Sequence, residues 1–232
     1  YLPHGCLVDS INDKGDQSKI ENCMLLEIWP LSREEKEAYI KEGWFAYPKE
    51  FEEYFLADID PTGADYKEDA QMTAYDMDQY TLADSLGFCY WWMVYYTYPV
   101  INSRALIAEL VSTATGLDID EAEVTKIAKR TANLIRAHHV TAGIRRKDDR
   151  PPKQLFQRPM QPAEEFIPSF ASVALVPTDL KLFDPRFFDK RIDSYYELRG
   201  WNSHGIPTKE TLEEFGLDYV RQDLERRGIL TG

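Results

Sequence analysis

The chain has 232 residues, of which 44% are hydrophobic and 13% aromatic, and its formal net charge is -13. This apolar content is enough for a folded protein with a substantial core and excludes a disordered chain. Because the sequence pI is about 4.8, we expect no basic face for a phosphate backbone and therefore no nucleic-acid partner.

The first predicted elements are helices that follow an irregular opening of about thirty residues. A capping box at Ser32-Arg33-Glu34-Glu35 predicts a helix that runs to about residue 42. Pro48 at a first helical position predicts a second helix over residues 49–55. From about residue 68, apolar residues recur at helical spacing and lead into the segment that holds Cys89; they are Met72, Tyr75, Met77, Tyr80 and Leu82.

The second half of the chain is also predicted to be helical. Asn102 or Ser103 caps a helix that stops before Gly116, and Asp120 begins a longer one. The longer helix is expected to keep one apolar face, made of Val124, Ile127, Ala128, Thr131, Leu134 and Ile135. Prolines at positions 151, 152, 159, 162, 168 and 177 make residues 150–185 an extended connection, and further helices are predicted over residues 186–199, 208–215 and 218–227. The fold class is therefore mainly α.

The cysteines and the apolar runs limit the cellular compartments in which the protein is expected. Cys6, Cys23 and Cys89 are widely spaced and form no CxxC pair, which excludes a disulfide framework and a self-contained zinc site. This usage fits a reducing cytoplasm, the expected location. No apolar run approaches the ~18 residues that a membrane span needs, so no membrane insertion is expected. Because the chain opens on Tyr1, we expect it to be one piece of a larger polypeptide.

The most informative segment is the hexapeptide Asp84-Ser-Leu-Gly-Phe-Cys89. It combines a carboxylate, a glycine that allows a bulky group to come close to the backbone, and a thiol of the kind that iron–sulfur clusters require. The alternative interpretation is the start of a helix, with Asp84 as N-cap, Gly87 in the first turn and Cys89 as a buried apolar residue. The hexapeptide by itself does not decide between the two.

Two further motifs follow, and each has an ordinary structural interpretation. Residues 130–136 and His138-His139 precede the charged turn 145–150; adjacent histidines on a helix point about 100° apart and cannot chelate one metal together. The turn is typical of a solvated run of charges. Residues 192–202, followed by Gly205-Ile206-Pro207-Thr208, predict a helix, a turn and another helix, and favour a packing role.

Taken together, the three motifs resemble the C-terminal part of the tungsten-containing aldehyde ferredoxin oxidoreductase family. The family pattern has Asp-x-x-Gly-x-Cys, then an Asn-Leu-x-Arg helix ending in Arg/Lys-Asp-Asp-x-x-Pro, then Tyr-Tyr-x-x-Arg-Gly-Trp-x-x-x-Gly-x-Pro-Thr. The same order is found here from residue 84 to residue 208. The resemblance implies the α-helical third domain of that family over residues 68–232, preceded by an irregular segment with short helices over residues 1–67. It also implies that the N-terminal domains are absent from this chain.

The resemblance assigns cofactor-binding roles to four residues. Asp84 corresponds to a carboxylate that hydrogen-bonds a pterin of a tungsten bis-pterin cofactor, and Gly87 and Phe88 correspond to backbone contacts with it. Cys89 corresponds to the fourth thiolate on the iron of a [4Fe-4S] cluster. Since such a cluster usually needs four ligands, the family's CxxCxxxC group and its earlier pterin-binding segment must come from elsewhere.

The chain also departs from the family pattern. The family's Arg-Gly-x-Cys-His segment has its nearest counterpart in residues 12–15 and 21–25, without the histidine, so no proton-transfer role carries over and the catalytic acid or base stays unknown. His138-His139 and Ala142 stand where the family more often has Phe-Asn and Glu. The aromatic run over residues 90–98 fits either a substrate channel or, by its spacing, the core.

The resemblance implies an oxidoreductase that converts aldehydes to carboxylic acids and passes electrons to ferredoxin or to an electron-transfer subunit. A rival is the catalytic subunit of a tungsten-dependent benzoyl-CoA reductase, which acts on an aromatic acyl-CoA; the missing Cys-His segment and the aromatic excess point to it. A third hypothesis, from another class, is a non-catalytic helical interaction module that has lost its cofactor.

Overall fold

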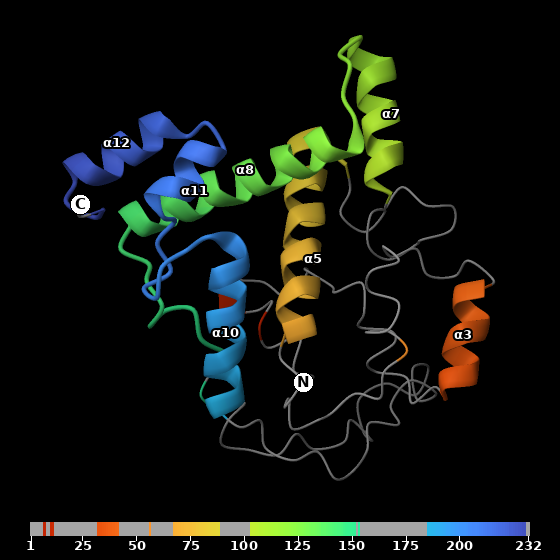
Figure 1. The fold of residues 1–232 in the computed structure, drawn as a ribbon, viewed down its shortest axis with the longest axis horizontal. Coiled ribbons are helices and arrows are strands. Elements are labelled where there is room, and N and C mark those ends of the chain that lie inside the picture. Colours follow the sequence, from red (N-terminus) through yellow and green to blue (C-terminus); the bar gives the residue numbers. More distant parts are fainter. Residues whose placement is uncertain are drawn as a thin grey trace.

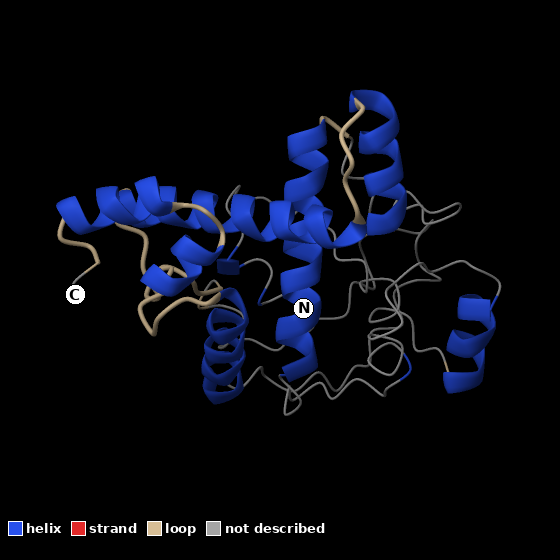
Figure 2. Ribbon diagram, turned by 45° about the horizontal axis from the view of Figure 1, so that its top comes forward, coloured by secondary structure: helices blue, strands red, loops and turns tan. Residues whose placement is uncertain are grey.

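The computed structural model describes residues 7, 10, 11, 32–41, 56, 67–88, 103–151, 153 and 185–230. The helices within these ranges are α3 (Arg33–Lys41), α5 (Lys67–Leu86), α7 (Arg104–Thr115), α8 (Glu121–Thr141), α10 (Pro185–Arg199), α11 (Lys209–Glu214) and α12 (Asp218–Arg226). The described part of the chain has no strand, and its isolated β-bridge pairs Trp201 with Pro207 (Figures 1 and 2). The mainly α fold class is confirmed.

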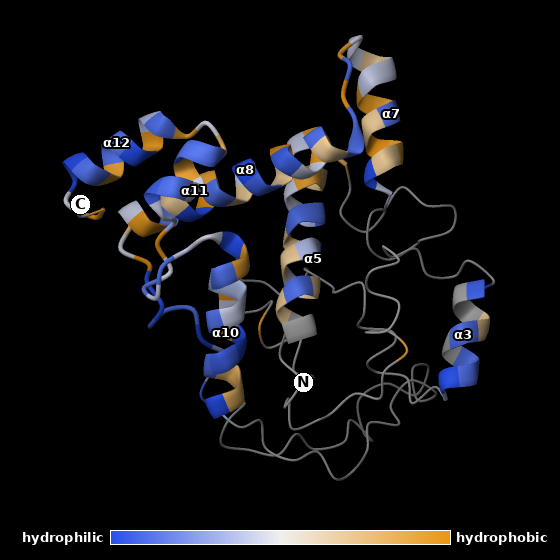
Figure 3. Cartoon of the chain, viewed as in Figure 1, coloured by the Kyte–Doolittle hydropathy of each residue, from blue (hydrophilic) through white to orange (hydrophobic). Residues whose placement is uncertain are grey.

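Helix α5 lies among the other helices and packs against both α10 and α8 (Figure 1). It is buried on most of its circumference, and polar and apolar residues alternate along it without a clear apolar stripe (Figure 3). Its buried residues are Ala70, Met72, Thr73, Tyr75, Asp76, Asp78, Gln79, Tyr80, Thr81, Leu82 and Ala83. A helix surrounded in this way must find hydrogen-bond partners for its buried polar groups, because an unpaired one is costly.

The core of the described residues has three clusters, two of which lie along α8. One cluster joins α5 to α10 through residues that include Phe188, Ile192 and Tyr195. A second joins α5, α7 and the first half of α8, and a third joins the second half of α8 to α11 and α12. Helix α8 therefore changes its packing partner halfway along.

The predicted helix ends are confirmed by their capping bonds. The Ser32 backbone N–H donates to Glu35 Oε2 over 2.8 Å, and the Glu35 N–H donates back to Ser32 Oγ over 3.3 Å, which completes the capping box of α3. Ser103 Oγ accepts from the Leu106 N–H at the start of α7, and Asp120 Oδ1 accepts from the Glu123 N–H at 2.8 Å.

The apolar face predicted for α8 is partly wrong. Leu134 is 38% exposed, whereas Asn133 and Arg136, which the pattern left out, are buried. The reason is the change of partner along α8: the buried stripe shifts around the helix where the contact passes from α5 and α7 to α11 and α12. Buried polar residues are tolerated on this stripe because partners distant in the sequence satisfy them.

Two other predictions fall on residues that the structure does not describe. They are the helix over residues 49–55 and most of the extended connection over residues 150–185. Among the described helices, none is both long enough and apolar enough to cross a membrane.

Candidate functional site

The hexapeptide 84–89 begins in the last turn of α5. The Phe88 N–H donates to the Ala83 carbonyl at 2.9 Å, the Gly87 N–H donates to the Asp84 carbonyl at 3.3 Å, and Gly87 has a φ of 72°. A residue with positive φ that follows a helix and carries this bonding pattern is a helix C-terminal stop. The alternative interpretation, in which Asp84 caps the start of a helix, is therefore wrong, because the chain leaves a helix here.

This helix end is open to an incoming group. Asp84 and Gly87 are exposed, Phe88 is 39% exposed, and a Cβ placed on Gly87 would meet no atom within 4 Å. The last turn of α5 carries no basic residue, so the Asp84 carboxylate adds to the negative end of the helix dipole. Such an end favours ligands that present N–H or O–H donors, and the donor-rich edge of a pterin fits it.

Cys89 lies just beyond the described residues. Within the described residues, no three side chains of His, Cys, Asp or Glu come together in a way that could hold a metal ion. The expectation that further cluster ligands must come from elsewhere therefore stays a prediction.

The second and third motifs meet in one buried polar network. Arg136 on α8 donates through Nη1 to Asp149 Oδ1 at 2.8 Å and through Nη2 to Asp149 Oδ2, a bidentate pair. Tyr196 on α10 donates its hydroxyl to the same Asp149 oxygen, and Arg136 Nε donates to the Gly205 carbonyl at 2.7 Å. Trp201 packs under the Arg136 guanidinium, 4.7 Å from ring centroid to Cζ.

Asn133 extends this network by one link. The Trp201 indole N–H donates to Asn133 Oδ1 at 2.7 Å, and Asn133 Nδ2 donates to the Lys129 carbonyl at 3.0 Å. Asn133, Arg136, Asp149, Tyr196 and Trp201, which we call the Arg136 network, are all buried. Their role is to lock α8, the turn after it and α10 together, which confirms the packing role expected for residues 192–202.

The electrostatics of the Arg136 network follow from burial and pairing. Burial raises the pKa of Tyr196 well above its usual value, and the hydrogen bond to Asp149 raises it further. Burial alone would lower the pKa of Arg136, but the hydrogen bond and charge of Asp149 reverse that effect and raise it. Both groups therefore keep their protons at physiological pH, and Asp149 is compensated by Arg136.

A second buried cluster, around Asp78 on α5, was not anticipated from the sequence. Arg199 Nη1 lies 2.5 Å from Asp78 Oδ1, and Arg199 Nη2 donates to the Ala74 carbonyl at 2.8 Å. Arg104 Nη2 lies 3.5 Å from the other Asp78 oxygen. The available signal was the placing of Asp76 and Asp78 among the apolar positions Tyr75, Met77 and Tyr80, because a buried carboxylate needs a cationic partner.

The Asp78 cluster ties α5 to its neighbours. Arg199 Nε also donates to the Tyr195 hydroxyl at 3.0 Å, and Arg104 Nη1 donates to Thr125 Oγ1 on α8 at 3.0 Å. Burial would lower the pKa of Arg199, yet Asp78 and Tyr195 raise it, so the buried guanidinium stays charged. Because these bonds connect α5 with α7, α8 and α10, they hold the helix whose end carries Asp84 and Gly87.

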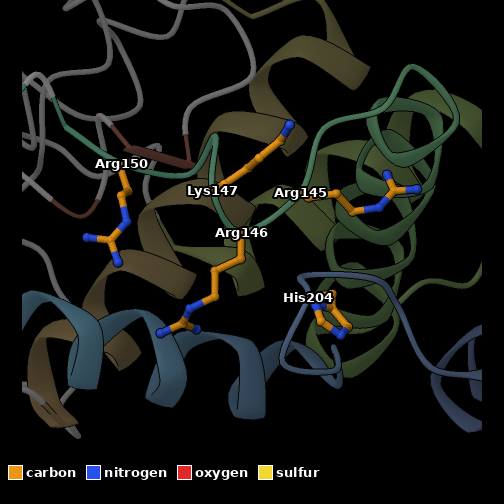
Figure 4. Close-up of a pocket in the computed structure, with 5 residues that line it drawn as sticks. All are labelled: Arg145, Arg146, Lys147, Arg150 and His204. Carbon is orange, nitrogen blue, oxygen red and sulfur yellow. The ribbon is translucent and has the colours of Figure 1, made fainter.

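The charged turn 145–150 lines a pocket. Arg145, Arg146, Lys147 and Arg150 from the turn and His204 from the loop before α11 surround a cavity of about 440 Å³ (Figure 4). The sequence had favoured a solvated run of charges at this position. Of the two histidines at the end of α8, His138 is exposed, and its ring centroid lies 6.2 Å from that of His139.

Known proteins are similar to this chain over most or all of its length. A family model described as aldehyde ferredoxin oxidoreductase, domains 2 and 3, matches residues 28–217. No curated protein matches. Among solved structures, the chain is similar to the active-site complex BamBC of benzoyl coenzyme A reductase in complex with 1,5-dienoyl-CoA, with 24% identity and a TM-score of 0.75.

That similarity covers 100% of this chain but 32% of the matched chain, so the described fold corresponds to a part of a longer polypeptide there. The family model matches most of the sequence, including all three motifs, and the fold agrees with it. The chain belongs to the aldehyde ferredoxin oxidoreductase family, in the region of its domains 2 and 3.

Proposed function

We propose that the chain is the C-terminal part of a tungsten bis-pterin, [4Fe-4S]-dependent oxidoreductase that converts aldehydes to carboxylic acids, with ferredoxin or an electron-transfer subunit as acceptor. The observation that carries the proposal is the exposed, negatively polarised end of α5 at Asp84 and Gly87, which directly precedes Cys89. Membership of the family, with its three motifs in register, supports it.

The residues at the end of α5 have distinct tasks in this proposal. The Asp84 carboxylate accepts hydrogen bonds from the N–H groups of a pterin, and the open side of Gly87 lets that ring approach the backbone. Cys89 contributes one thiolate to the cluster. When bound, the metal and the cluster supply the two-electron redox chemistry and the route for the electrons. The protein binds and orients both cofactors, and the Asp78 cluster fixes the position of α5, whose end carries Asp84.

A second candidate is ring reduction of an aromatic acyl-CoA by the same kind of centre. The structural similarity to a benzoyl coenzyme A reductase complex that contains 1,5-dienoyl-CoA favours it. The two candidates are separated by assaying the full-length protein for benzaldehyde oxidation and for conversion of dienoyl-CoA. Turnover of the aldehyde alone supports the first candidate, and turnover of the thioester supports the second.

The test of the cofactor assignment is the Cys89→Ala variant of the full-length protein. We expect loss or conversion of the cluster, seen as a changed electron paramagnetic resonance signal, while circular dichroism shows that helical content is kept. Cys6→Ala is the matched thiol control and should leave the signal as it is. An unchanged cluster signal in Cys89→Ala would refute the ligand assignment.

The Asp84→Ala variant tests the pterin contact separately. We expect less bound pterin and tungsten per protein, because the carboxylate that accepts from the ring is gone. Asp118→Ala, at an exposed aspartate in the turn before α8, is the control. Normal cofactor occupancy in Asp84→Ala contradicts the role, and a wild-type protein without tungsten, molybdenum or iron would favour the interaction module instead.

A further inference from the structure

Arg104 stands at a position where its own helix does not favour an arginine. It is the first residue of α7, whose first turn carries no acidic residue, so its positive charge lies at the positive end of the helix dipole. Its side chain is nevertheless only 12% exposed. Because burial of a cation is costly without partners, the reason for this arginine lies in its contacts with other helices.

The guanidinium of Arg104 reaches two neighbouring helices. Its Nε donates to Gln79 Oε1 on α5 at 3.2 Å, and its Nη1 donates to Thr125 Oγ1 on α8 at 3.0 Å. Its Nη2 lies 3.5 Å from Asp78 Oδ2, and its Cζ lies 4.6 Å from the centroid of the Tyr75 ring. One side chain of α7 therefore binds α5 and α8 at the same time, which the planar fork of an arginine allows.

One apolar cluster joins the last turns of α5 to α7 and to the first half of α8 (Figure 1). Its buried residues are Leu82, Ala83, Ile107, Ala108, Val124 and Ala128. Three of these six are alanines, whose short side chains interlock little, and apolar burial has no preferred direction. Such a contact allows small sliding of one helix along another. The hydrogen bonds of Arg104 supply the directional part of the contact among the three helices.

The position of the last turns of α5 matters for Asp84. This exposed carboxylate directly follows Ala83 of the apolar cluster, and the Ala83 carbonyl accepts the Phe88 N–H that stops the helix. A hydrogen bond weakens steeply when its length or angle departs from the favoured range, so a small shift of the helix end is enough to spoil a contact with a ligand. Apolar packing tolerates the same shift.

We infer that Arg104 is a positioning residue for the pterin contact of Asp84. It fixes the last turns of α5 against α7 and α8, so that the Asp84 carboxylate meets the N–H donors of the ring. The inference rests on the proposed function and deepens it, because Arg104 acts through Asp84. A purely structural arginine would lower the stability of the fold without changing how tightly the folded protein holds its pterin.

The experiment is a double-mutant cycle on the full-length protein, with Arg104→Met and Asp84→Ala made singly and together. Methionine keeps an unbranched apolar stem and removes the guanidinium. The rate at which each loaded variant releases pterin is followed by the fluorescence of the released, oxidised ring. We expect each single variant to release pterin roughly tenfold faster or more, the value of one hydrogen bond to a charged group. The combined variant should release it no faster than Asp84→Ala, because the carboxylate through which Arg104 acts is already gone.

Two control variants separate this role from a loss of stability. Arg130→Met makes the same change at an exposed arginine on α8 and should release pterin as wild type does. Asp149→Asn weakens the Arg136 network, none of whose members lies on α5, and its folded fraction should also release pterin at the wild-type rate. Chemical denaturation gives the stability of every variant, so that release rates are compared at known stability.

The outcomes separate the inference from the proposed function. Additive effects in the combined variant, wild-type release by Arg104→Met, or equal release by Arg104→Met and Asp149→Asn overturn the inference and leave the proposed function in place. A wild-type protein without pterin overturns both. If Arg104→Met does not fold, Thr125→Val takes its place in the cycle; it removes one partner of the arginine by an isosteric change, and the same expectation and the same contrary results apply.

Discussion

At the scale of single residues, Arg136 shows why its type matters. It makes a bidentate pair with Asp149, donates to the Gly205 carbonyl at 2.7 Å and stacks on Trp201. A lysine offers one point charge and no planar fork, so it could not make these contacts together. Within the family pattern Asn-Leu-x-Arg, the arginine of this chain therefore has a structural task.

The first prediction concerns the partner of that arginine. Asp149→Asn leaves Arg136 buried beside a neutral amide, and we expect the free energy of unfolding to fall by about 3–5 kcal/mol. Chemical denaturation followed by circular dichroism measures it. Asp118→Asn makes the same chemical change at an exposed position and should alter stability by less than about 0.5 kcal/mol. Equal small effects in both variants would show that the buried pair does not stabilise the fold.

At the scale of elements, the loop between α10 and α11 is held in place by side-chain hydrogen bonds to its backbone. Asn202 Oδ1 accepts from the His204 and Ile206 N–H groups, at 2.9 and 3.2 Å, and Thr211 Oγ1 donates to the Gly200 carbonyl at 2.9 Å. The chain can fold back here because Gly205 has a φ of 74° and no side chain. The loop in turn holds Trp201 under Arg136 and His204 at the basic pocket.

A matched pair of glycine variants tests this loop. In Gly205→Ala, the new Cβ would lie 2.3 Å from Arg136 Nη2 and 2.7 Å from the Tyr196 hydroxyl oxygen, so the Arg136 network must move. In Gly116→Ala, φ is almost the same at 76° but nothing lies within 4 Å. Both variants bear the cost of a positive φ, on the order of 1 kcal/mol, and we expect Gly205→Ala to lose at least about 2 kcal/mol more.

Thermal and chemical unfolding of the two glycine variants give that difference directly. If both lose the same stability, the backbone conformation accounts for the whole effect, and the close approach of Gly205 to Arg136 is unimportant.

At the scale of the whole molecule, the buried Tyr196 makes the free energy of unfolding decrease at alkaline pH. The pKa of Tyr196 is raised above its usual 10.0, first by burial and then by Asp149. Below pH 10 both the folded and the unfolded chain keep this proton, and the contribution to stability is present in full. Above it the unfolded chain loses the proton while the folded chain retains it, so the free energy of unfolding falls by about 1.4 kcal/mol per pH unit.

Tyr196→Phe removes this contribution. We expect a lower stability at neutral pH, because Asp149 loses a donor, but a shallower decline between about pH 10 and 11.5 than in wild type. Tyr219→Phe, at an exposed tyrosine, should leave the slope as it is. A slope in Tyr196→Phe that equals that of wild type contradicts the retained proton.

The sequence by itself determined the family and the helices that the structure describes. Helix ends were predictable at Ser32, Ser103, Asp120 and Gly116 because each capping bond joins residues only three or four positions apart. The three motifs were recognisable because residue types, order and spacing can all be read from the sequence without knowing the fold. The same local reading left open whether Asp84 began or ended a helix, which depends on where α5 stops.

The tertiary structure alone decided which side chains meet. Asp78 and Arg199 are 121 residues apart, and Arg136 and Gly205 are 69 apart, so no local periodicity could pair them. The same holds for the pocket that joins Arg145 and Lys147 to His204, which the sequence presented as a solvated run of charges. Burial and partnership of a polar group are set by packing between distant helices, and that packing also exposed Leu134 while it buried Asn133.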